Sequence, residues 1–150
     1  MGVYRHDREG FTLVLPDGWH AQEDVASVAL VAAEPEGAHP AFRANLTVTV
    51  ELAGGLDAEG LTDASLAAQE RALESFQLID RSTAQLAGGS GTRTLGHHDM
   101  QGRAIVIEQW RLVAGDRGYG VTASCWALDY DDLADVFAAA AETLRAGVEP

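Results

Sequence analysis

Strict alternation of apolar and polar residues marks one strand in this chain. In the segment NLTVTVEL, Leu46, Val48, Val50 and Leu52 alternate with Asn, Thr and Glu residues. Because successive side chains of a strand point to opposite faces, the four apolar side chains lie on one face. The pattern therefore predicts a strand over residues 45–52 with one face packed on a core.

Less regular apolar runs predict further strands, each bounded by turn-forming residues. The PDGW sequence follows the first of them, and the GGSG and GDRG sequences separate the later ones. Because GDRG is so short, we expect the two strands that it joins to pair as an antiparallel hairpin. The further strands are residues 11–15, 27–33, 76–86, 92–99, 104–114 and 119–128.

Helical periodicity is present in two segments. Leu66, Leu73 and Phe76 recur at helical spacing behind a Thr62 or Asp63 cap, which predicts a helix of about four turns. Residues 129–145 carry a longer apolar stripe and acidic residues near its start, which predicts an amphipathic helix. That stripe consists of Leu133, Val136, Phe137, Ala140 and Leu144.

The predicted elements follow the order β-β-β-α-β-β-β-β-α, and no linker or internal repeat separates them. Antiparallel hairpins combined with helices are typical of the α+β class. A chain of 150 residues with 47% hydrophobic content can bury one sizeable core, but a second core would be cramped. We therefore predict a single α+β domain over residues 1–150.

Several segments form a pattern that spans nearly the whole chain: FTLVLPDGW, SVALVAA, NLTVTVEL, the first helix, QW, YGVTASC and the closing helix. This pattern resembles the PsbP-like α/β sandwich family, in the branch that includes DcrB-like and LpqN-like bacterial proteins. The resemblance implies a bent antiparallel sheet of about six or seven strands with both helices packed on one face. It implies no activity, since relatives include accessory subunits, lipoproteins and chaperones that hold hydrophobic segments of secreted effectors.

Charge and composition argue against several classes of function. The 23 acidic and 10 basic residues give a net charge of -13, which repels nucleic-acid phosphates and anionic lipid headgroups. No segment has the roughly 20 apolar residues of a membrane helix, and the N-terminus shows no signal-peptide pattern. The single cysteine, Cys125, cannot form an internal disulfide and fits a reducing compartment. We therefore expect a cytoplasmic protein that binds no nucleic acid and inserts into no membrane.

The sequence contains no constellation that specifies a catalytic centre or a cofactor site. Ser90 lacks the second glycine of a nucleophile elbow, and Cys125 lies in an apolar strand, where burial makes a thiol unreactive. His97, His98 and Asp99 are a weak metal-site candidate, because adjacent strand side chains point to opposite faces and the two imidazoles would not meet at one ion. We expect no catalytic residue, no cofactor and no metal.

Strand parity groups other residues on one face of the predicted sheet. If Ile105, Ile107, Val121, Ala123 and Cys125 face the helices, the aromatic, hydroxyl and acidic side chains between them face the other way. A mixed surface of this kind is typical of the core of a binding interface. The candidate binding residues are Thr47, Thr49, Glu108, Trp110, Thr122, Ser124 and Trp126.

Strand 104–114 is apolar on both sides, so an alternative places Val106, Trp110 and Leu112 in the core. The leading hypothesis is a non-enzymatic binding or accessory module. Its helix-free sheet face would take a protein partner, a hydrophobic segment of a secreted protein, or a second copy of the chain. A second hypothesis is a small-molecule or enzymatic site in the concavity of the sheet, using Glu108, Arg111 or His98. A third is that the acidic surface engages a basic protein.

Overall fold

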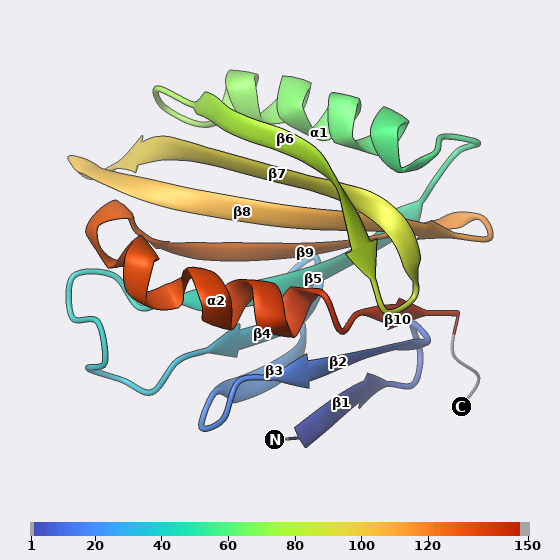
Figure 1. Cartoon of the computed structure of the whole chain (residues 1–150), viewed down its shortest axis with the longest axis horizontal. Helices are drawn as coiled ribbons and strands as arrows, with labels where there is room; N and C mark the ends of the chain where they lie inside the picture. Colours follow the sequence, from blue (N-terminus) through green and yellow to red (C-terminus); the bar gives the residue numbers. More distant parts are fainter. Residues whose placement is uncertain (1, 148–150) are drawn as a thin grey trace.

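The structure, a computed structural model, describes residues 2–147 and contains two helices and two antiparallel sheets among them. Figure 1 shows these elements in chain order. The helices are α1 (Ala58–Ala72) and α2 (Tyr130–Ala141), and a 3-10 turn, η1 (Ala127–Asp129), precedes α2. The strands are β1 (Gly2–His6), β2 (Phe11–Leu15), β3 (His20–Val25), β4 (Val28–Ala33), β5 (Asn45–Leu52), β6 (Gln77–Leu86), β7 (Gly89–Met100), β8 (Arg103–Ala114), β9 (Arg117–Trp126) and β10 (Arg145–Ala146).

The larger sheet has seven strands in the order β3-β4-β5-β9-β8-β7-β6, and the smaller has three in the order β1-β2-β10. Every strand pair among the described residues is antiparallel, which confirms the predicted α+β class. The prediction missed β1, β3 and β10. In β3, all six residues, HAQEDV, are exposed, so this strand carries no apolar alternation that could reveal it.

The two helices pack on opposite faces of the large sheet, so the prediction that both cover one face is wrong. Helix α2 lies with the small sheet on one face, where Phe137 and Phe11 join Trp110 and Val121 in the buried core. Helix α1 lies on the other face, where Gln69 donates a hydrogen bond to Gln109 on β8. Figure 1 shows α2 in front of the sheet and α1 along its upper border, near β6 and β7.

The core beside α2 is apolar, as the sequence stripe predicts. Leu133 and Phe137 are buried on α2, and Leu144 is buried just beyond the end of the helix. Trp19, which follows the PDG turn, packs its ring edge-on against Phe137 with 6.4 Å between the ring centroids. This contact holds the turn after β2 against α2, a structural role that suits a large amphipathic ring.

Helix α1 begins earlier than predicted. Asp57 is its N-cap and accepts a hydrogen bond of 2.8 Å from the backbone N–H of Gly60. Thr62 is fully buried inside the helix and lies 2.6 Å from the hydroxyl of Thr92 on β7, and Asp63 pairs with Arg81. Both residues that were predicted as caps therefore serve to attach α1 to the sheet.

A two-residue turn joins β8 to β9 and fixes their register, because Ala114 pairs with Arg117. In this register each odd-numbered residue of β8 lies opposite an even-numbered residue of β9. Trp110 is therefore a neighbour of Val121 on the α2 face, and it is 1% exposed. The alternative that assigned Trp110 to the core is correct.

Among the residues that the structure describes, no helix is both long enough and apolar enough to cross a membrane.

Trp110 and Trp126 give a direct test of this register. We expect Trp110→Ala to lower the free energy of unfolding by about 3 to 5 kcal/mol, because it leaves a large cavity in the core. Trp126→Ala should lower it by about 1 kcal/mol or less, since it removes a half-buried ring and one cation–π contact. Urea unfolding of both variants measures the difference, and equal losses would show that the two rings share one environment.

Candidate functional site

One half of the α1 side of the large sheet carries a row of short polar side chains. We call this surface the threonine face and define it by Asn45, Thr47 and Thr49 on β5 and Thr122, Ser124 and Trp126 on β9. Thr47 pairs with Thr122 and Asn45 pairs with Ser124 across the two strands, so these side chains point to the same side. None of the six residues is buried.

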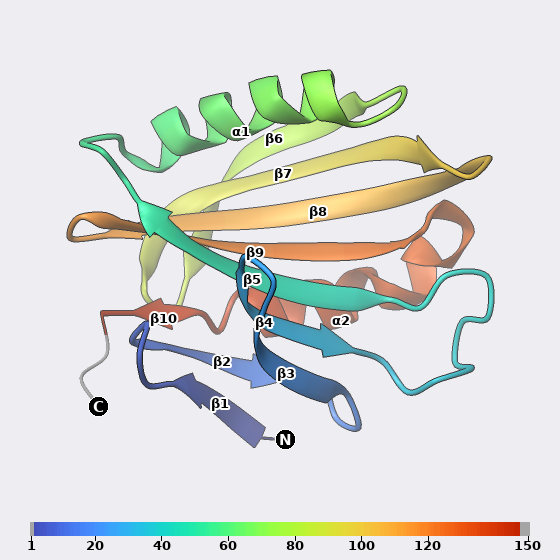
Figure 2. The same ribbon diagram turned by 180° about the vertical axis from the view of Figure 1, so that it is seen from behind.

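Helix α1 leaves the threonine face open because it lies over β7 and β8 instead. Figure 2 shows β4, β5 and β9 with no helix in front of them. A chain of hydrogen bonds marks the boundary, where Gln69 of α1 donates to Gln109 and Gln109 donates to the hydroxyl of Thr122 over 2.9 Å. Helix α1 therefore covers the sheet only as far as β8, and the open surface consists of β9 and β5.

An aromatic residue and a cavity form one end of the threonine face. The guanidinium of Arg103 lies 5.9 Å from the ring centroid of Trp126, which is cation–π distance. Beside them is a cavity of about 230 Å³ that combines apolar and polar walls. It is lined by Ala41, Phe42, Met100, Gln101, Arg103 and Ile105.

The loop that contributes Ala41 and Phe42 is held by a buried carboxylate. Glu34 is 3% exposed, and its Oε1 accepts a hydrogen bond of 2.9 Å from the backbone N–H of Ala44. Its Oε2 lies 2.7 Å from Nδ1 of His39. The hydrogen bond to Glu34 raises the pKa of His39, although desolvation acts in the opposite direction.

Five of the seven predicted binding residues lie on the threonine face, and two do not. Trp110 and Glu108 point to the opposite face, where both are buried. The prediction was wrong for them because it placed the even-numbered residues of both β8 and β9 on one face. In the structure, the even-numbered residues of β8 pair with odd-numbered residues of β9 and share their face. The shortness of the turn between β8 and β9 is the sequence signal that would have placed both residues correctly.

Glu108 forms a buried network with Arg93 and Tyr130. Arg93 Nη2 lies 2.6 Å from Glu108 Oε2, and the Tyr130 hydroxyl donates to Oε1 over 3.0 Å. Desolvation raises the pKa of Glu108, and the Arg93 charge partly opposes that shift. Desolvation and the adjacent Glu108 also raise the pKa of Tyr130 to about 12. Both carboxylate oxygens are thus engaged inside the protein.

The other candidate chemical groups do not converge. His97 and His98 lie on a regular strand opposite Val106 and Ile105, so they point to opposite faces. Cys125 is fully buried, and burial raises its pKa to about 12, so its thiolate is not available near neutral pH. Ser90 lies in β7 beside the hairpin turn, opposite Gln85.

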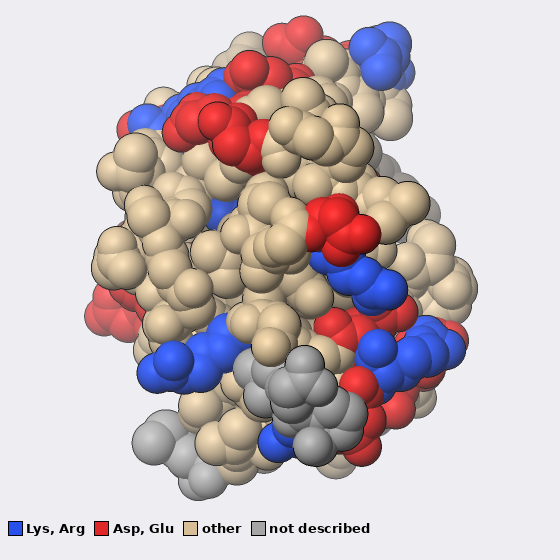
Figure 3. Space-filling view, turned by 90° about the vertical axis from the view of Figure 1, so that its right-hand side faces the viewer, with Lys and Arg blue, Asp and Glu red and all other residues tan. Residues whose placement is uncertain are grey.

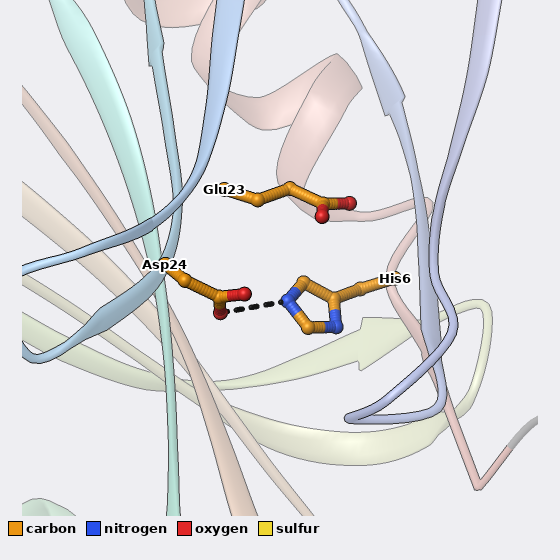
Figure 4. A group of neighbouring side chains, drawn as sticks. All are labelled: His6, Glu23 and Asp24. Carbon is orange, nitrogen blue, oxygen red and sulfur yellow. Dashed lines mark hydrogen bonds and ion pairs between the residues drawn. The ribbon is translucent and has the colours of Figure 1, made fainter.

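One cluster that the sequence did not indicate combines His6 of β1 with Glu23 and Asp24 of β3 (Figure 4). The ligand atoms of these three side chains lie within 4.8 Å of one another, which is compatible with a metal ion. His6 and the two carboxylates are far apart in the sequence, so no spacing could reveal the cluster.

The hydrogen bonds of His6 argue against metal coordination in this cluster. Nδ1 of His6 accepts a hydrogen bond of 3.1 Å from the backbone N–H of Glu9, so a neutral ring carries its hydrogen on Nε2. That hydrogen faces Asp24 Oδ1, which lies 3.2 Å from Nε2, and Arg8 Nη2 donates to the same oxygen over 2.7 Å. A histidine that binds a metal normally donates through its second nitrogen, the reverse of what is seen here. The cluster instead joins the small sheet to the edge of the large one.

Comparison with known proteins identifies the fold. No family model matches the chain, and no curated protein matches it by sequence. Among solved structures, LpqN of Mycobacterium tuberculosis, described as involved in cell envelope biogenesis, is similar with a TM-score of 0.76 and 18% identity over 96% of this chain and 88% of LpqN. Cyanobacterial PsbP (CyanoP) of Synechocystis sp. PCC 6803 is similar with a TM-score of 0.73 and 12% identity over 97% and 91% of the two chains.

A third similar structure is PA94 of Pseudomonas aeruginosa, a putative regulator of unknown function, with a TM-score of 0.64 and 17% identity over 91% of this chain and 90% of that protein. These likenesses confirm the PsbP-like fold that the sequence pattern predicted. At this level of identity they establish the fold and no activity.

The Glu34–His39 pair predicts a pH dependence of stability. Because the folded state raises the pKa of His39 above its usual 6.5, the pair stabilises the fold fully below about pH 6.5. This stabilisation is lost as the pH rises through the higher folded pKa. Urea unfolding from pH 5.5 to 8.5 should show the decline, and His39→Gln should flatten that part of the profile. A profile that is identical in the variant would contradict the assignment.

The His6 cluster predicts one tautomer. Long-range ¹H–¹⁵N NMR spectra near neutral pH should show His6 with its hydrogen on Nε2, because Nδ1 accepts the Glu9 N–H. Equimolar Zn²⁺ should leave the His6 signals in place. Selective loss of the Nε2–H form on adding Zn²⁺ would instead establish a metal site, and His20, which is exposed on β3, serves as the internal control for nonspecific binding.

Proposed function

We propose that this chain is a non-enzymatic accessory module that binds a protein partner through the threonine face. The observation that carries the proposal is an open half of a sheet face that bears hydroxyls, an amide and a tryptophan but few charges. Tryptophan is enriched at the centre of binding interfaces, where charged side chains are depleted. Two of the similar structures, LpqN and CyanoP, agree with an accessory role.

The state of the chemical groups supports a binding role over catalysis. Glu108, Cys125 and Tyr130 have the shifted pKa values that often mark active sites. Here Glu108 and Tyr130 bond to each other, and Cys125 is fully buried. A catalytic acid, base or nucleophile must reach its substrate, whereas Glu108 and Cys125 are buried and the Tyr130 hydroxyl is bonded to Glu108.

The chemistry of the threonine face favours a polar partner over a hydrophobic segment. Thr and Ser hydroxyls can donate and accept hydrogen bonds, so they suit the main chain or polar side chains of another protein. A chaperone site for apolar segments needs a wide apolar surface, and the six residues of this face include one aromatic ring. A protein partner is therefore preferred, with a second copy of the chain as a special case. The cytoplasmic location stays a prediction from the sequence.

Site-specific photo-crosslinking tests the proposal. A benzophenone amino acid placed at Thr122 in the native host should yield adducts of discrete mass that mass spectrometry can identify. The same amino acid at Ala67, which is exposed on α1, is the matched control and should not yield them. Adding Thr47→Arg to the Thr122 probe should remove the adducts, because a long charged side chain then occupies the neighbouring position.

Equal adducts from Thr122 and Ala67, or none from Thr122 in a folded protein, would refute the proposal. An adduct with the mass of a dimer would identify the partner as a second copy of the chain.

A further inference from the structure

Half of the ten arginines form an ion pair with a carboxylate within residues 2–147, and Arg111 does not. Arg81, Arg93 and Arg117 each pair with at least one carboxylate. On the end of the molecule shown in Figure 3, several blue side chains lie beside red ones. Within residues 2–147, no carboxylate lies within 4.0 Å of the Arg111 guanidinium, and its side-chain hydrogen bond goes to the neutral hydroxyl of Ser65 on α1.

The Arg111 side chain lies between α1 and the sheet, where it is partly buried. Desolvation lowers the pKa of Arg111, and the nearby Glu51 carboxylate opposes that shift only in part. A guanidinium with five N–H donors and no anion costs free energy in such a place. An anionic group that binds beside it would recover part of that cost.

Arg111 belongs to the cross-strand row that ends the threonine face. Gly120 pairs with Thr49 on one side and with Arg111 on the other. A Cβ at position 120 would lie 3.2 Å from Thr49 Oγ1 and 3.9 Å from Arg111 Cγ. The glycine therefore leaves free the space between the hydroxyl and the guanidinium stem. A cavity of about 20 Å³ opens here, with Thr49, Glu51, Leu61 and Gly118 also in its walls.

We propose that Arg111 forms a subsite for a carboxylate group of whatever lies on the threonine face. A carboxylate matches the flat fork of a guanidinium and carries a single negative charge. A phosphate brings more negative charge, which Glu51 and the net charge of -13 oppose. A cavity of about 20 Å³ has room for roughly one water-sized group, such as one carboxylate oxygen. The identity of the carrier rests on the proposed function, but the carboxylate subsite does not.

Acetate is the simplest probe of the subsite. In ¹H–¹⁵N NMR titrations at pH 7 and constant ionic strength, sodium acetate should cause saturable shifts at the Arg111 Nε–H and at the backbone amides of Gly118 and Gly120. Sodium sulfate at the same ionic strength should cause weaker shifts at these positions. Arg111→Gln should weaken acetate binding at least tenfold, and Arg111→Lys should also weaken it because an ammonium lacks the planar fork.

Matched controls separate a binding role from a structural one. Arg71 is exposed in the last turn of α1, so Arg71→Gln should leave the acetate response unchanged. Arg111→Gln should keep or raise the melting temperature, because it removes a desolvated charge. Acetate shifts that do not saturate, or that persist in Arg111→Gln, would overturn the subsite. A large fall in melting temperature with an unchanged acetate response in Arg111→Lys would assign Arg111 a structural role instead.

A second titration, with a peptide, distinguishes a polypeptide from a small free carboxylate as the source of the bound group. A short Ser- and Thr-containing peptide with a free C-terminal carboxylate is compared with acetate and with its C-terminal amide. Tighter binding of the free-acid peptide, reduced both by Arg111→Gln and by Thr122→Arg, supports a polypeptide carrier. Equal binding of peptide and acetate, unaffected by Thr122→Arg, supports a small free carboxylate. In that case the subsite stands, and the threonine face loses its role as a docking surface for a polypeptide.

Discussion

The two-residue turn between β8 and β9 is the constraint on which the rest of the structure depends. It pairs Ala114 with Arg117 and so decides the face of every side chain on the two central strands. Val106, Trp110 and Leu112 join Val121, Ala123 and Cys125 on one face and form the apolar core under α2. The same register puts Gln109 beside Thr122 and Arg111 beside Gly120 on the other face. If the pairing register of these strands shifted by one residue, the apolar side chains of one strand would face the polar side of the sheet and its polar side chains would face the core.

The two faces of the large sheet therefore have different physical characters. The α2 face is held by burial of large apolar and aromatic side chains. The α1 face is held in part by polar pairs, the buried Thr62 with Thr92 and the partly buried Gln69 with Gln109, whose hydrogen bonds offset the cost of burial but add less free energy. A polar interface of this kind explains why α1 shows a weaker apolar stripe in the sequence than α2.

The sequence predicted the elements whose apolar residues repeat regularly, and it failed where stability comes from other sources. Strand β5 and helix α2 were correct because Leu46, Val48, Leu133 and Phe137 are buried at the expected period. The start of α1 was missed because its cap, Asp57, lies before the first periodic residue. Strand β3 has no buried residue, so only its pairing with β4 defines it. The threonine residues of β5 and β9 share one face as predicted, because Thr47 pairs with Thr122 and this register does not depend on β8.

Each face of the large sheet carries one charged residue whose environment bears on function, Glu108 on the α2 face and Arg111 on the α1 face. Glu108 on the α2 face is buried with its arginine, so its charge is balanced within the fold. Arg111 on the α1 face has no such counterpart among the described residues, although the chain has more than twice as many acidic as basic residues. In a chain with abundant carboxylates, a partly desolvated cation with no carboxylate in contact is a local conflict that packing alone does not explain. Conflicts of this kind are expected at functional sites, where stability is given up for binding. Its place at the border of the open sheet face, and not inside the apolar core, is what makes this residue accessible to a partner.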